Sequence, residues 1–232
     1  MIEFIFLDLD DTILDFHRAE AVAIRKTLHA LNVEPTDEVV ARYSEINDRH
    51  WKALERGELT REQVKLGRFH VLFEELGVGI SASVAKSLYE KNLSMGHFFV
   101  DGAPKLLMTL AARYPLYLAS NGTLSVQQKR IESAGIARYF KGIFISEELG
   151  VNKPDKAFFD LCAAQIPGFD PASAVILGDS LSSDVQGGIN AGMHTCWFNP
   201  NGKTCGDIQP EFEISALSQF TSVLERLNGE KT

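Results

Sequence analysis

An apolar segment near the start of the chain ends in a cluster of carboxylates. Residues 2–7 read IEFIFL, and they are followed by Asp8, Asp10, Asp11 and Thr12. The length and the β-branched and aromatic content of the segment predict a buried strand. In open α/β sheets, ligands bind where the carboxyl ends of the strands meet. The first dozen residues therefore predict a fold class, the place of its site and a candidate nucleophile.

Behind this segment the pattern of the chain changes twice. Residues 15 to about 94 carry apolar residues at helical spacing in four successive stretches with no strand between them, which is typical of a small helical bundle. From residue 98 onward strands and helices alternate, with strands expected over residues 116–119, 143–145, 174–177 and 195–198. This alternation predicts an α/β fold, a Rossmann-like doubly wound parallel sheet, with the α-helical bundle inserted after its first strand.

Local signals place the ends of the bundle helices. We expect these helices over residues 16–31, 37–56, 61–77 and 83–93. Thr60 and Gln63 have the spacing of a capping box at the start of the third helix. Residues 228–232, at the other end of the chain, are expected to fray.

Composition excludes several classes of protein. The 232 residues are 45% hydrophobic and 23% charged, and no apolar run approaches the roughly 20 residues of a membrane span. The formal net charge of −8 offers no basic face for nucleic acid. Cys162, Cys196 and Cys205 lack metal-ligand spacing and are interpreted as reduced thiols. We therefore expect a cytoplasmic protein that binds neither nucleic acid nor membranes.

Polar side chains follow the later strands as the aspartates follow the first. Ser120 and Asn121 come directly after the second core strand, and Asp179 comes after the fourth. Lys153 lies in the loop behind the third strand, and Asp184 follows five residues after Asp179. Each signal alone is weak, because ordinary turns use the same residue types. Parallel strands would nevertheless bring all of these side chains to one edge of the sheet.

In this order the motifs resemble those of the haloacid dehalogenase-like (HAD) superfamily of hydrolases. The matching segments are Asp8-Leu9-Asp10-Asp11-Thr12, Ser120-Asn121-Gly122, Lys153-Pro154, and Gly178-Asp179-Ser180 with Asp184. The resemblance covers the whole chain, because the superfamily carries a helical cap between its first and second motifs. It implies a catalytic core of residues 1–14 and 99–232 and a cap of residues 15–98 that governs substrate specificity.

Within the superfamily the chain is similar to the pyrimidine 5′-nucleotidases that act on nonstandard nucleotides. The supporting stretches are Trp51 with Gly57 and Thr60, Arg68-Phe69, residues 145–151, and residues 187–192 followed by Thr195-Cys196-Trp197. This similarity implies that the substrate is a pyrimidine nucleoside 5′-monophosphate.

The two leading aspartates suit phosphoryl transfer. A carboxylate attacks phosphorus without a base to activate it, so Asp8 is the candidate nucleophile and would form an aspartyl-phosphate. Asp10 lies two residues on and would protonate the leaving alcohol, then deprotonate the water that hydrolyses the intermediate. Carbon–halogen displacement needs no such acid, which disfavours a dehalogenase. Asp11 is interpreted as an exposed turn or helix-capping residue.

The charge balance of the predicted site calls for a cation. Three aspartates and a phosphate bring more negative charge than Lys153 can neutralise, and an all-oxygen ligand set suits Mg²⁺. The resemblance implies that Asp8, Asp179 and the backbone carbonyl of Asp10 bind this Mg²⁺, and that Asp184 does so directly or through water. It also implies that Ser120 and the N–H of Asn121 hold phosphate oxygens and that Lys153 neutralises Asp8 and the phosphate. Thr12 is expected to orient the loop and to contact the substrate.

Specificity for the leaving group is expected to come from the cap. The candidate contacts are Phe16, His17, Asn47, Trp51, Arg68 and Phe69. Trp51 could stack on a nucleobase, a contact worth roughly 1–3 kcal/mol. Arg68 could reach a sugar or carbonyl oxygen. For the aromatic residues, packing in the bundle interior is the competing interpretation.

The sequence therefore predicts a Mg²⁺-dependent phosphatase that acts on phosphate monoesters through an aspartyl-phosphate, with pyrimidine nucleoside 5′-monophosphates as substrates. A sugar-phosphate phosphatase or a phosphomutase of the same superfamily remains an alternative. A non-catalytic binding protein on the same fold has less support, because Asp8, Asp10, Lys153 and Asp179 are all present. The partner is expected to be a small molecule, and the chain a monomer or weak homodimer.

Overall fold

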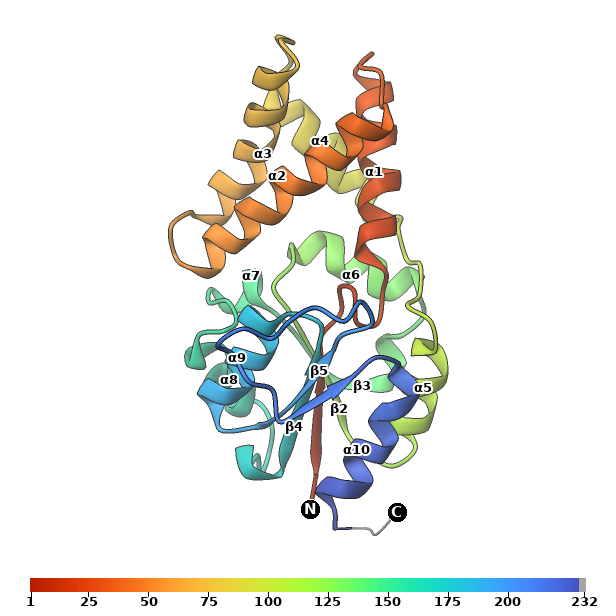
Figure 1. Cartoon of the computed structure of the whole chain (residues 1–232), viewed down its shortest axis with the longest axis vertical. Coiled ribbons are helices and arrows are strands. Elements are labelled where there is room, and N and C mark those ends of the chain that lie inside the picture. The colour runs from red at the N-terminus through yellow and green to blue at the C-terminus, as the bar shows by residue number, and fades with distance from the viewer. Residues whose placement is uncertain (230–232) are drawn as a thin grey trace.

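A parallel six-stranded sheet organises the fold in the computed structural model, which describes residues 1–229 (Figure 1). Across the sheet the strands lie in the order β3-β2-β1-β4-β5-β6. The strands are β1 (Phe4–Leu7), β2 (Leu116–Ser120), β3 (Phe140–Ile145), β4 (Ala174–Gly178), β5 (His194–Phe198) and β6 (Phe212–Ile214). All pairs of neighbouring strands are parallel, so the predicted fold class is confirmed.

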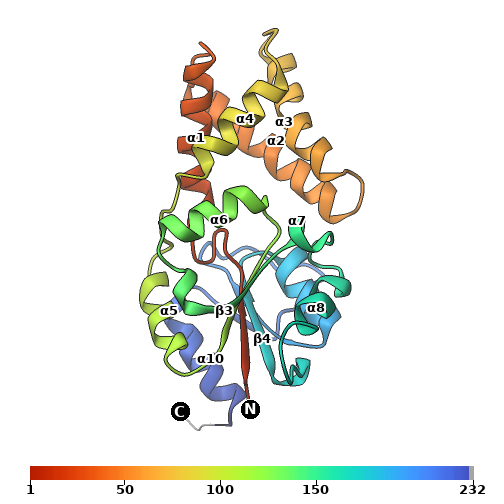
Figure 2. The same cartoon turned by 180° about the vertical axis from the view of Figure 1, so that it is seen from behind.

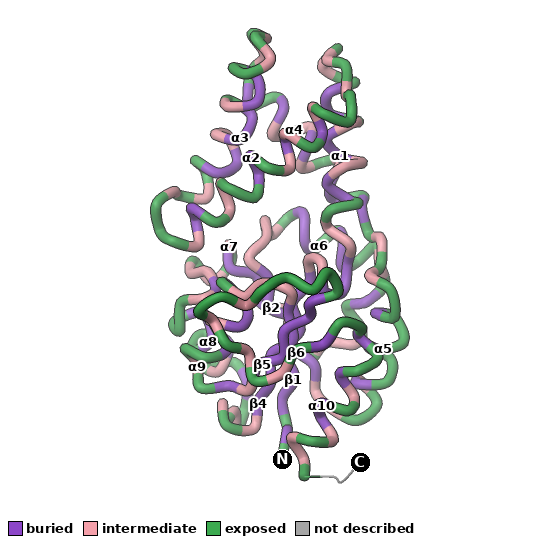
Figure 3. The backbone as a smooth tube through the Cα atoms, in the orientation of Figure 1, coloured by how far each residue is buried: buried purple, intermediate pink, exposed green. Residues whose placement is uncertain are grey.

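Strand β1 occupies the centre of the sheet, between β2 and β4. All four of its residues are buried, and its side chains alternate between two cores. Ile5 and Leu7 join a core closed by α5 (Ala103–Ala111) and α10 (Phe220–Leu227). Phe4 and Phe6 join the opposite core, which is closed by α8 (Lys156–Ala163). Helices on both faces bury the strand completely, as its continuous apolar run predicts. Buried residues accordingly run along the central strands (Figure 3).

Four helices lie above the carboxyl edge of the sheet and are here called the cap helices (Figures 1 and 2). They are α1 (Phe16–Ala30), α2 (Asp37–Glu55), α3 (Arg61–Glu75) and α4 (Ala82–Leu93). Tyr43, Phe69 and Tyr89 contact one another in their interior. The predicted capping box of Thr60 and Gln63 is present at the start of α3. The division of the chain at residues 14 and 98 stays a prediction.

The C-terminal part of the chain contains structure that we did not predict. Strand β6 has only three residues, too few for a period of two to be recognised. Helix α10 carries Phe220, Val223 and Leu224 at helical spacing, so its sequence does contain a helical signal. The expected fraying is wrong for Asn228, whose amide accepts a 2.7 Å hydrogen bond from the N–H of Ile2. The N–H of Gly229 donates a 3.1 Å hydrogen bond to the carbonyl of Arg226. The rest of that expectation, for residues 230–232, lies outside the described residues.

The core helices not named so far are α6 (Leu124–Ser133), α7 (Ser146–Leu149) and α9 (Gln186–Ala191). A π-helical turn over Leu181–Val185 precedes α9. Among residues 1–229, no helix combines the length and the apolar character that crossing a membrane requires.

Candidate active site

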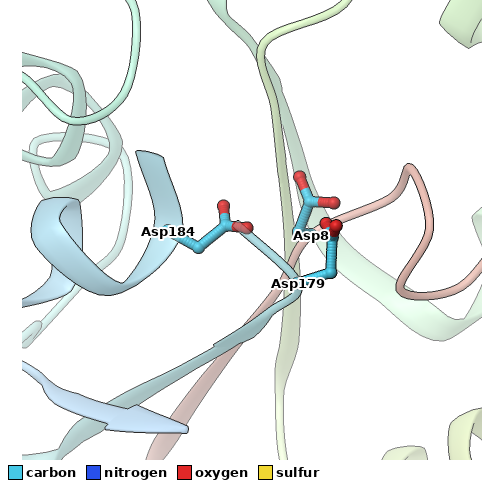
Figure 4. Close-up of side chains that lie close together, drawn as sticks. All are labelled: Asp8, Asp179 and Asp184. Carbon is cyan, nitrogen blue, oxygen red and sulfur yellow. The ribbon is translucent and has the colours of Figure 1, made fainter. Parts of the chain in front are cut away.

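Three aspartates from separate parts of the chain meet at the carboxyl edge of the sheet (Figure 4). Asp8 directly follows β1, Asp179 directly follows β4, and Asp184 lies in the π-helical turn. Each offers a carboxylate oxygen within 4.8 Å of the others. The backbone N–H of Asp8 donates to the carbonyl of Leu177, so the sheet ladder itself holds the first carboxylate in place.

A glycine makes room for one of these carboxylates. A Cβ atom on Gly178 would lie 2.2 Å from Oδ2 of Asp184, which is closer than two non-bonded atoms can approach. Asp184 can therefore turn back against the end of β4 because residue 178 has no side chain. The N–H of Ser180 then donates a 3.1 Å hydrogen bond to the same Oδ2 atom.

Lys153 lies among the carboxylates and is fully buried. Its Nζ atom donates to Oδ1 of Asp8 at 2.7 Å, to Oδ1 of Asp184 at 2.6 Å and to the carbonyl of Ala119 at 2.7 Å. Its backbone is fixed by a reciprocal pair of 2.9 Å hydrogen bonds with the side-chain amide of Asn121. The structure thus brings together Asp8, Lys153, Asn121 and Asp184 as the sequence predicts.

The charges of this cluster do not balance. Burial raises the pKa of Asp8 well above its usual range, and repulsion by Asp184 raises it further against the opposing effect of Lys153. Burial, followed by repulsion from Asp8 and Asp184, also raises the pKa of Asp179. For Lys153, burial alone would lower the pKa, but attraction by Asp184 and Asp8 outweighs burial and raises it. One ammonium faces three carboxylates, so a divalent cation with oxygen ligands fits this site.

Asp10 is held by two residues of α6 that sequence reasoning missed. Gln127 donates a 2.6 Å hydrogen bond to Oδ2 of Asp10, and Nη1 of Arg130 donates to Oδ1. The Gln127 amide also donates to Oγ of Ser120 at 2.9 Å. A signal was available in the sequence: Gln127 and Arg130 lie at helical spacing with the apolar residues Val126 and Ile131 and share their buried face.

Asp11 and Thr12, the last two residues of the first motif, differ in their position relative to the site. Asp11, at a positive φ of 55°, accepts hydrogen bonds from the N–H groups of Phe16 and His17 at 2.8 and 3.2 Å. It therefore caps the start of α1, in line with its non-catalytic interpretation. Thr12 is fully buried outside the cavity lining, and its hydroxyl has no hydrogen-bond partner among residues 1–229. This placement argues against the expected contact between Thr12 and substrate.

A cavity of about 790 Å³ separates the aspartates from the cap helices. Its core wall includes Asp8, Asp10, Ser120 and Asp179. The opposite wall comes from the cap helices and includes Phe16, His17, Glu20, Asn47, Trp51, Arg68 and Tyr89. Phe69 instead packs inside the bundle. Of the phenylalanine and tryptophan candidates, Phe16 and Trp51 thus line the cavity and Phe69 does not.

Comparison with known proteins identifies the family. A model of the haloacid dehalogenase-like hydrolase family matches residues 2–192. This segment contains Asp8, Lys153, Asp179 and Asp184, here called the aspartate–lysine cluster. The chain belongs to the haloacid dehalogenase-like hydrolases. The predicted superfamily membership and the prediction of an enzyme are therefore confirmed.

Individual relatives match this hydrolase over nearly its full length. HAD-hydrolase YfnB of Bacillus subtilis is 38% identical over 95% of this chain and 94% of its own. Pyrimidine 5′-nucleotidase PynA of Streptococcus pneumoniae is 34% identical over 99% and 98%, and pyrimidine 5′-nucleotidase YjjG of Escherichia coli is 30% identical over 96% and 97%. A crystal structure of YfnB, described as bound to magnesium, superposes with a TM-score of 0.92 over 96% of this chain and 98% of that one.

The cap wall of this hydrolase contains a buried polar network. Glu20 accepts hydrogen bonds from Ser44 at 2.6 Å and from Asn47 at 2.7 Å. Asn47 in turn accepts a 2.8 Å hydrogen bond from Nη1 of Arg68, whose guanidinium lies 4.6 Å from the ring centre of Tyr89. Burial raises the pKa of Glu20, although the hydrogen bonds from Ser44 and Asn47 oppose this effect. The network fixes Arg68 at the cavity wall.

Arg61 joins the cap helices of this hydrolase to its core, and sequence reasoning missed it. Its Nη1 atom donates to the carbonyls of Asn121 and Gly122 at 2.9 and 3.1 Å. Its Nη2 atom donates to Oγ of Ser146 at 2.6 Å, and its guanidinium lies 5.6 Å from the ring centre of Trp51. An arginine at the start of a surface helix has no sequence signature for such contacts.

Proposed function

We propose that this phosphoric monoester hydrolase is a Mg²⁺-dependent phosphatase whose substrates are pyrimidine nucleoside 5′-monophosphates. The observation that carries the proposal is the arrangement of Asp8, Lys153 and Asp184 at the floor of a cavity whose opposite wall is polar and aromatic. PynA and YjjG, which match nearly the whole chain, are named pyrimidine 5′-nucleotidases. The aspartate–lysine cluster suits phosphoryl transfer, and the names of the relatives suggest the leaving group.

The proposed reaction has two steps on the residues of the chain. A carboxylate oxygen of Asp8 attacks the phosphorus, and the bond from phosphorus to the nucleoside oxygen breaks while Asp10 gives its proton to that oxygen. A water molecule then loses a proton to Asp10 and attacks the aspartyl-phosphate, which releases phosphate and frees Asp8. Asp10 thus gives up one proton in the first step and regains one in the second step.

Other groups at the cavity floor support both steps. Ser120 and the N–H of Asn121 would hold phosphate oxygens, and Lys153 would offset the charge of Asp8 and of the phosphate. Mg²⁺, held by Asp8, Asp179 and Asp184, would stabilise the negative charge of the transferring group. The expected contribution of the Asp10 carbonyl to this Mg²⁺ site stays a prediction.

The cap wall suits a planar leaving group with carbonyl oxygens. Trp51 offers an aromatic face, and Arg68 offers guanidinium N–H groups that could donate to carbonyl oxygens of a pyrimidine. Asn47 accepts a hydrogen bond from Arg68 and donates one to Glu20, so Arg68 is held in place through Asn47. A sugar lacks the flat aromatic ring that Trp51 would cover, so the wall favours a nucleotide over a sugar phosphate.

A hydrolysis screen with Mg²⁺ tests the proposal. Phosphate release is measured on UMP, dTMP, CMP, purine nucleotides and sugar phosphates, with and without EDTA. We expect preference for the pyrimidine nucleotides, loss of activity in EDTA, and loss of activity in Asp8→Asn but not in Asp160→Asn, which alters an exposed carboxylate on α8. Preference for sugar phosphates would reject the substrate class. Activity that survives Asp8→Asn would reject the mechanism.

A further inference from the structure

We propose that Gln127 and Arg130 are positioning residues that hold Asp10 at the leaving-group side of the site. We further propose that Arg130 links this position to both connections between the cap helices and the core. The inference rests on the proposed function, because the acid/base role of Asp10 is part of it. Neither residue belongs to the sequence motifs that predicted the site.

Both carboxylate oxygens of Asp10 are engaged from α6. Gln127 donates to Oδ2 at 2.6 Å, and Nη1 of Arg130 donates to Oδ1. The same Nη1 atom donates to Oε1 of Gln127 at 2.9 Å, so the two holding residues also orient each other. A carboxylate fixed at both oxygens cannot rotate freely, and general acid catalysis depends on such alignment.

Gln127 also sets the distance between Asp10 and the phosphate-binding residues. Its Nε2 atom lies between Oδ2 of Asp10 and Oγ of Ser120, at 2.6 and 2.9 Å. A Cβ atom on Gly122 would lie 2.3 Å from this nitrogen, so only glycine at position 122 leaves room for it. The amide therefore bridges the proton-transfer residue to the loop expected to hold the phosphate.

The burial of Arg130 is what makes the pairing with Asp10 significant. The side chain is completely inaccessible to solvent. A buried guanidinium is costly unless charged and polar groups surround it. Asp10 is the only carboxylate that forms an ion pair with Arg130 among residues 1–229, so the arginine and the acid/base residue require each other.

Arg130 also contacts both segments that lead into and out of the cap helices. Its Nε atom donates a 2.8 Å hydrogen bond to the carbonyl of Gly96, in the segment that returns from α4 to the core. Its guanidinium lies 5.8 Å from the ring centre of Phe16, the first residue of α1. A shift of the cap helices displaces these two contacts, and Arg130 passes the displacement to Asp10.

The leaving group of the substrate distinguishes a positioning role from a structural one. A nucleoside alkoxide needs a proton to depart, whereas p-nitrophenolate departs readily without one. General acid catalysis typically contributes about 10²–10⁴-fold to a rate. Loss of Asp10 alignment should therefore slow hydrolysis of UMP far more than hydrolysis of p-nitrophenyl phosphate. Partial unfolding would slow both equally.

The experiment compares kcat and KM on the two esters for Gln127→Leu, Arg130→Lys and Asp10→Asn. We expect kcat on UMP to fall at least about tenfold more than kcat on p-nitrophenyl phosphate in each variant, with KM unchanged and Asp10→Asn the most affected. Gln128→Leu is the matched control, because Gln128 has the same chemistry on the exposed face of α6. Urea unfolding and Mg²⁺ titration calorimetry check folding and the metal site of each variant.

Equal losses on both esters in folded variants would overturn the inference, and so would wild-type kinetics in Gln127→Leu. Gln127 is uncharged, so its variant remains informative if Arg130→Lys fails to fold. Should the wild-type enzyme prefer a sugar phosphate, that alkyl ester replaces UMP in the comparison. In that case the pyrimidine proposal fails while the positioning of Asp10 is still tested.

Discussion

Lys153 donates a 2.6 Å hydrogen bond to Asp184 at a place where both side chains are only 1% exposed. The same ammonium reaches Asp8 at 2.7 Å. Removing one partner of a buried ion pair is far more costly than replacing both partners by apolar residues. The reason is that the remaining charge stays buried without a partner. Lys153 is therefore expected to stabilise the folded state, in addition to its proposed role in phosphoryl transfer.

The first prediction follows from this pairing. In the absence of Mg²⁺, Lys153→Met should lower the free energy of unfolding by about 3–5 kcal/mol, because Asp8 and Asp184 lose the buried ammonium that pairs with both of them. Added Mg²⁺ should recover part of this loss, since a ligand at 100 times its Kd contributes about 2.7 kcal/mol. Urea unfolding with EDTA or Mg²⁺ measures both effects.

Lys156→Met is the control for that experiment. Lys156 pairs with Asp160 on the surface of α8, and exposed pairs contribute about 0–1 kcal/mol. If Lys153→Met is as stable as the wild-type chain in EDTA, the charge argument for the aspartate–lysine cluster is wrong.

The second prediction concerns the contact between the cap helices and the core. Arg61→Met removes the hydrogen bonds to the carbonyls of Asn121 and Gly122 and to Ser146. Since hydrogen bonds to charged groups contribute about 1.5–3 kcal/mol each, kcat/KM on the preferred nucleotide should fall at least about tenfold. Amide hydrogen exchange over residues 121–124 should become faster.

Arg56→Met provides the comparison, because among residues 1–229 the only ion pair of Arg56 is with the exposed Glu58. Unchanged hydrogen exchange at residues 121–124 in Arg61→Met would show that the loop is held by the core alone.

The third prediction is a pH dependence of stability that originates at Glu20. Burial raises the pKa of Glu20, while Ser44 and Asn47 and the more distant His17 and Arg68 lower it in part. The folded chain thus keeps this proton to higher pH than the unfolded chain. The associated stability is complete below the ordinary glutamate range and is lost as pH rises through that range to the raised pKa.

Glu20→Gln should flatten this decline. Over that pH window the free energy of unfolding of the variant should fall less than that of the wild-type chain, because glutamine has no carboxyl group to titrate. Chemical denaturation across the pH series measures the slopes. Glu74→Gln, which alters an exposed glutamate on α3, should leave the slope unchanged. Parallel slopes in Glu20→Gln and wild type would contradict the prediction.

The fourth prediction addresses base recognition by Trp51. If its ring covers the pyrimidine, Trp51→Ala should weaken binding of UMP by roughly 1–3 kcal/mol, which appears as a higher KM. Trp51→Phe should retain most of the affinity. Inhibition by inorganic phosphate, which has no base, should not change in either variant. Equal weakening of UMP and phosphate binding would mean that Trp51 acts through cap packing instead.

The aspartate–lysine cluster could be predicted because a simple geometric rule applies to it. Asp8 and Asp179 follow parallel strands, so knowing the strands was enough to bring them together. Lys153 lies in the loop that follows α7, and Asp184 lies in the π-helical turn that follows β4.

The residues that escaped prediction lie on helices. Which side of α6 meets Asp10 depends on how the helix rotates against the sheet, and no spacing rule joins Arg130 to a residue 120 positions earlier. The contacts of Arg61 with the core depend in the same way on how the cap helices pack against it. The expected contact of Thr12 with substrate required its hydroxyl to face the cavity, but the side chain is buried outside the cavity lining.

The central position of β1 has a consequence for how the chain is made. Its hydrogen-bonding partners, β2 and β4, begin only at Leu116 and Ala174, after all four cap helices. During synthesis the cap helices can pack together while β1 does not yet have a strand to pair with. An apolar strand with open edges invites pairing with other chains. Slow translation between the cap helices and Gly178 should therefore increase aggregation of the nascent protein.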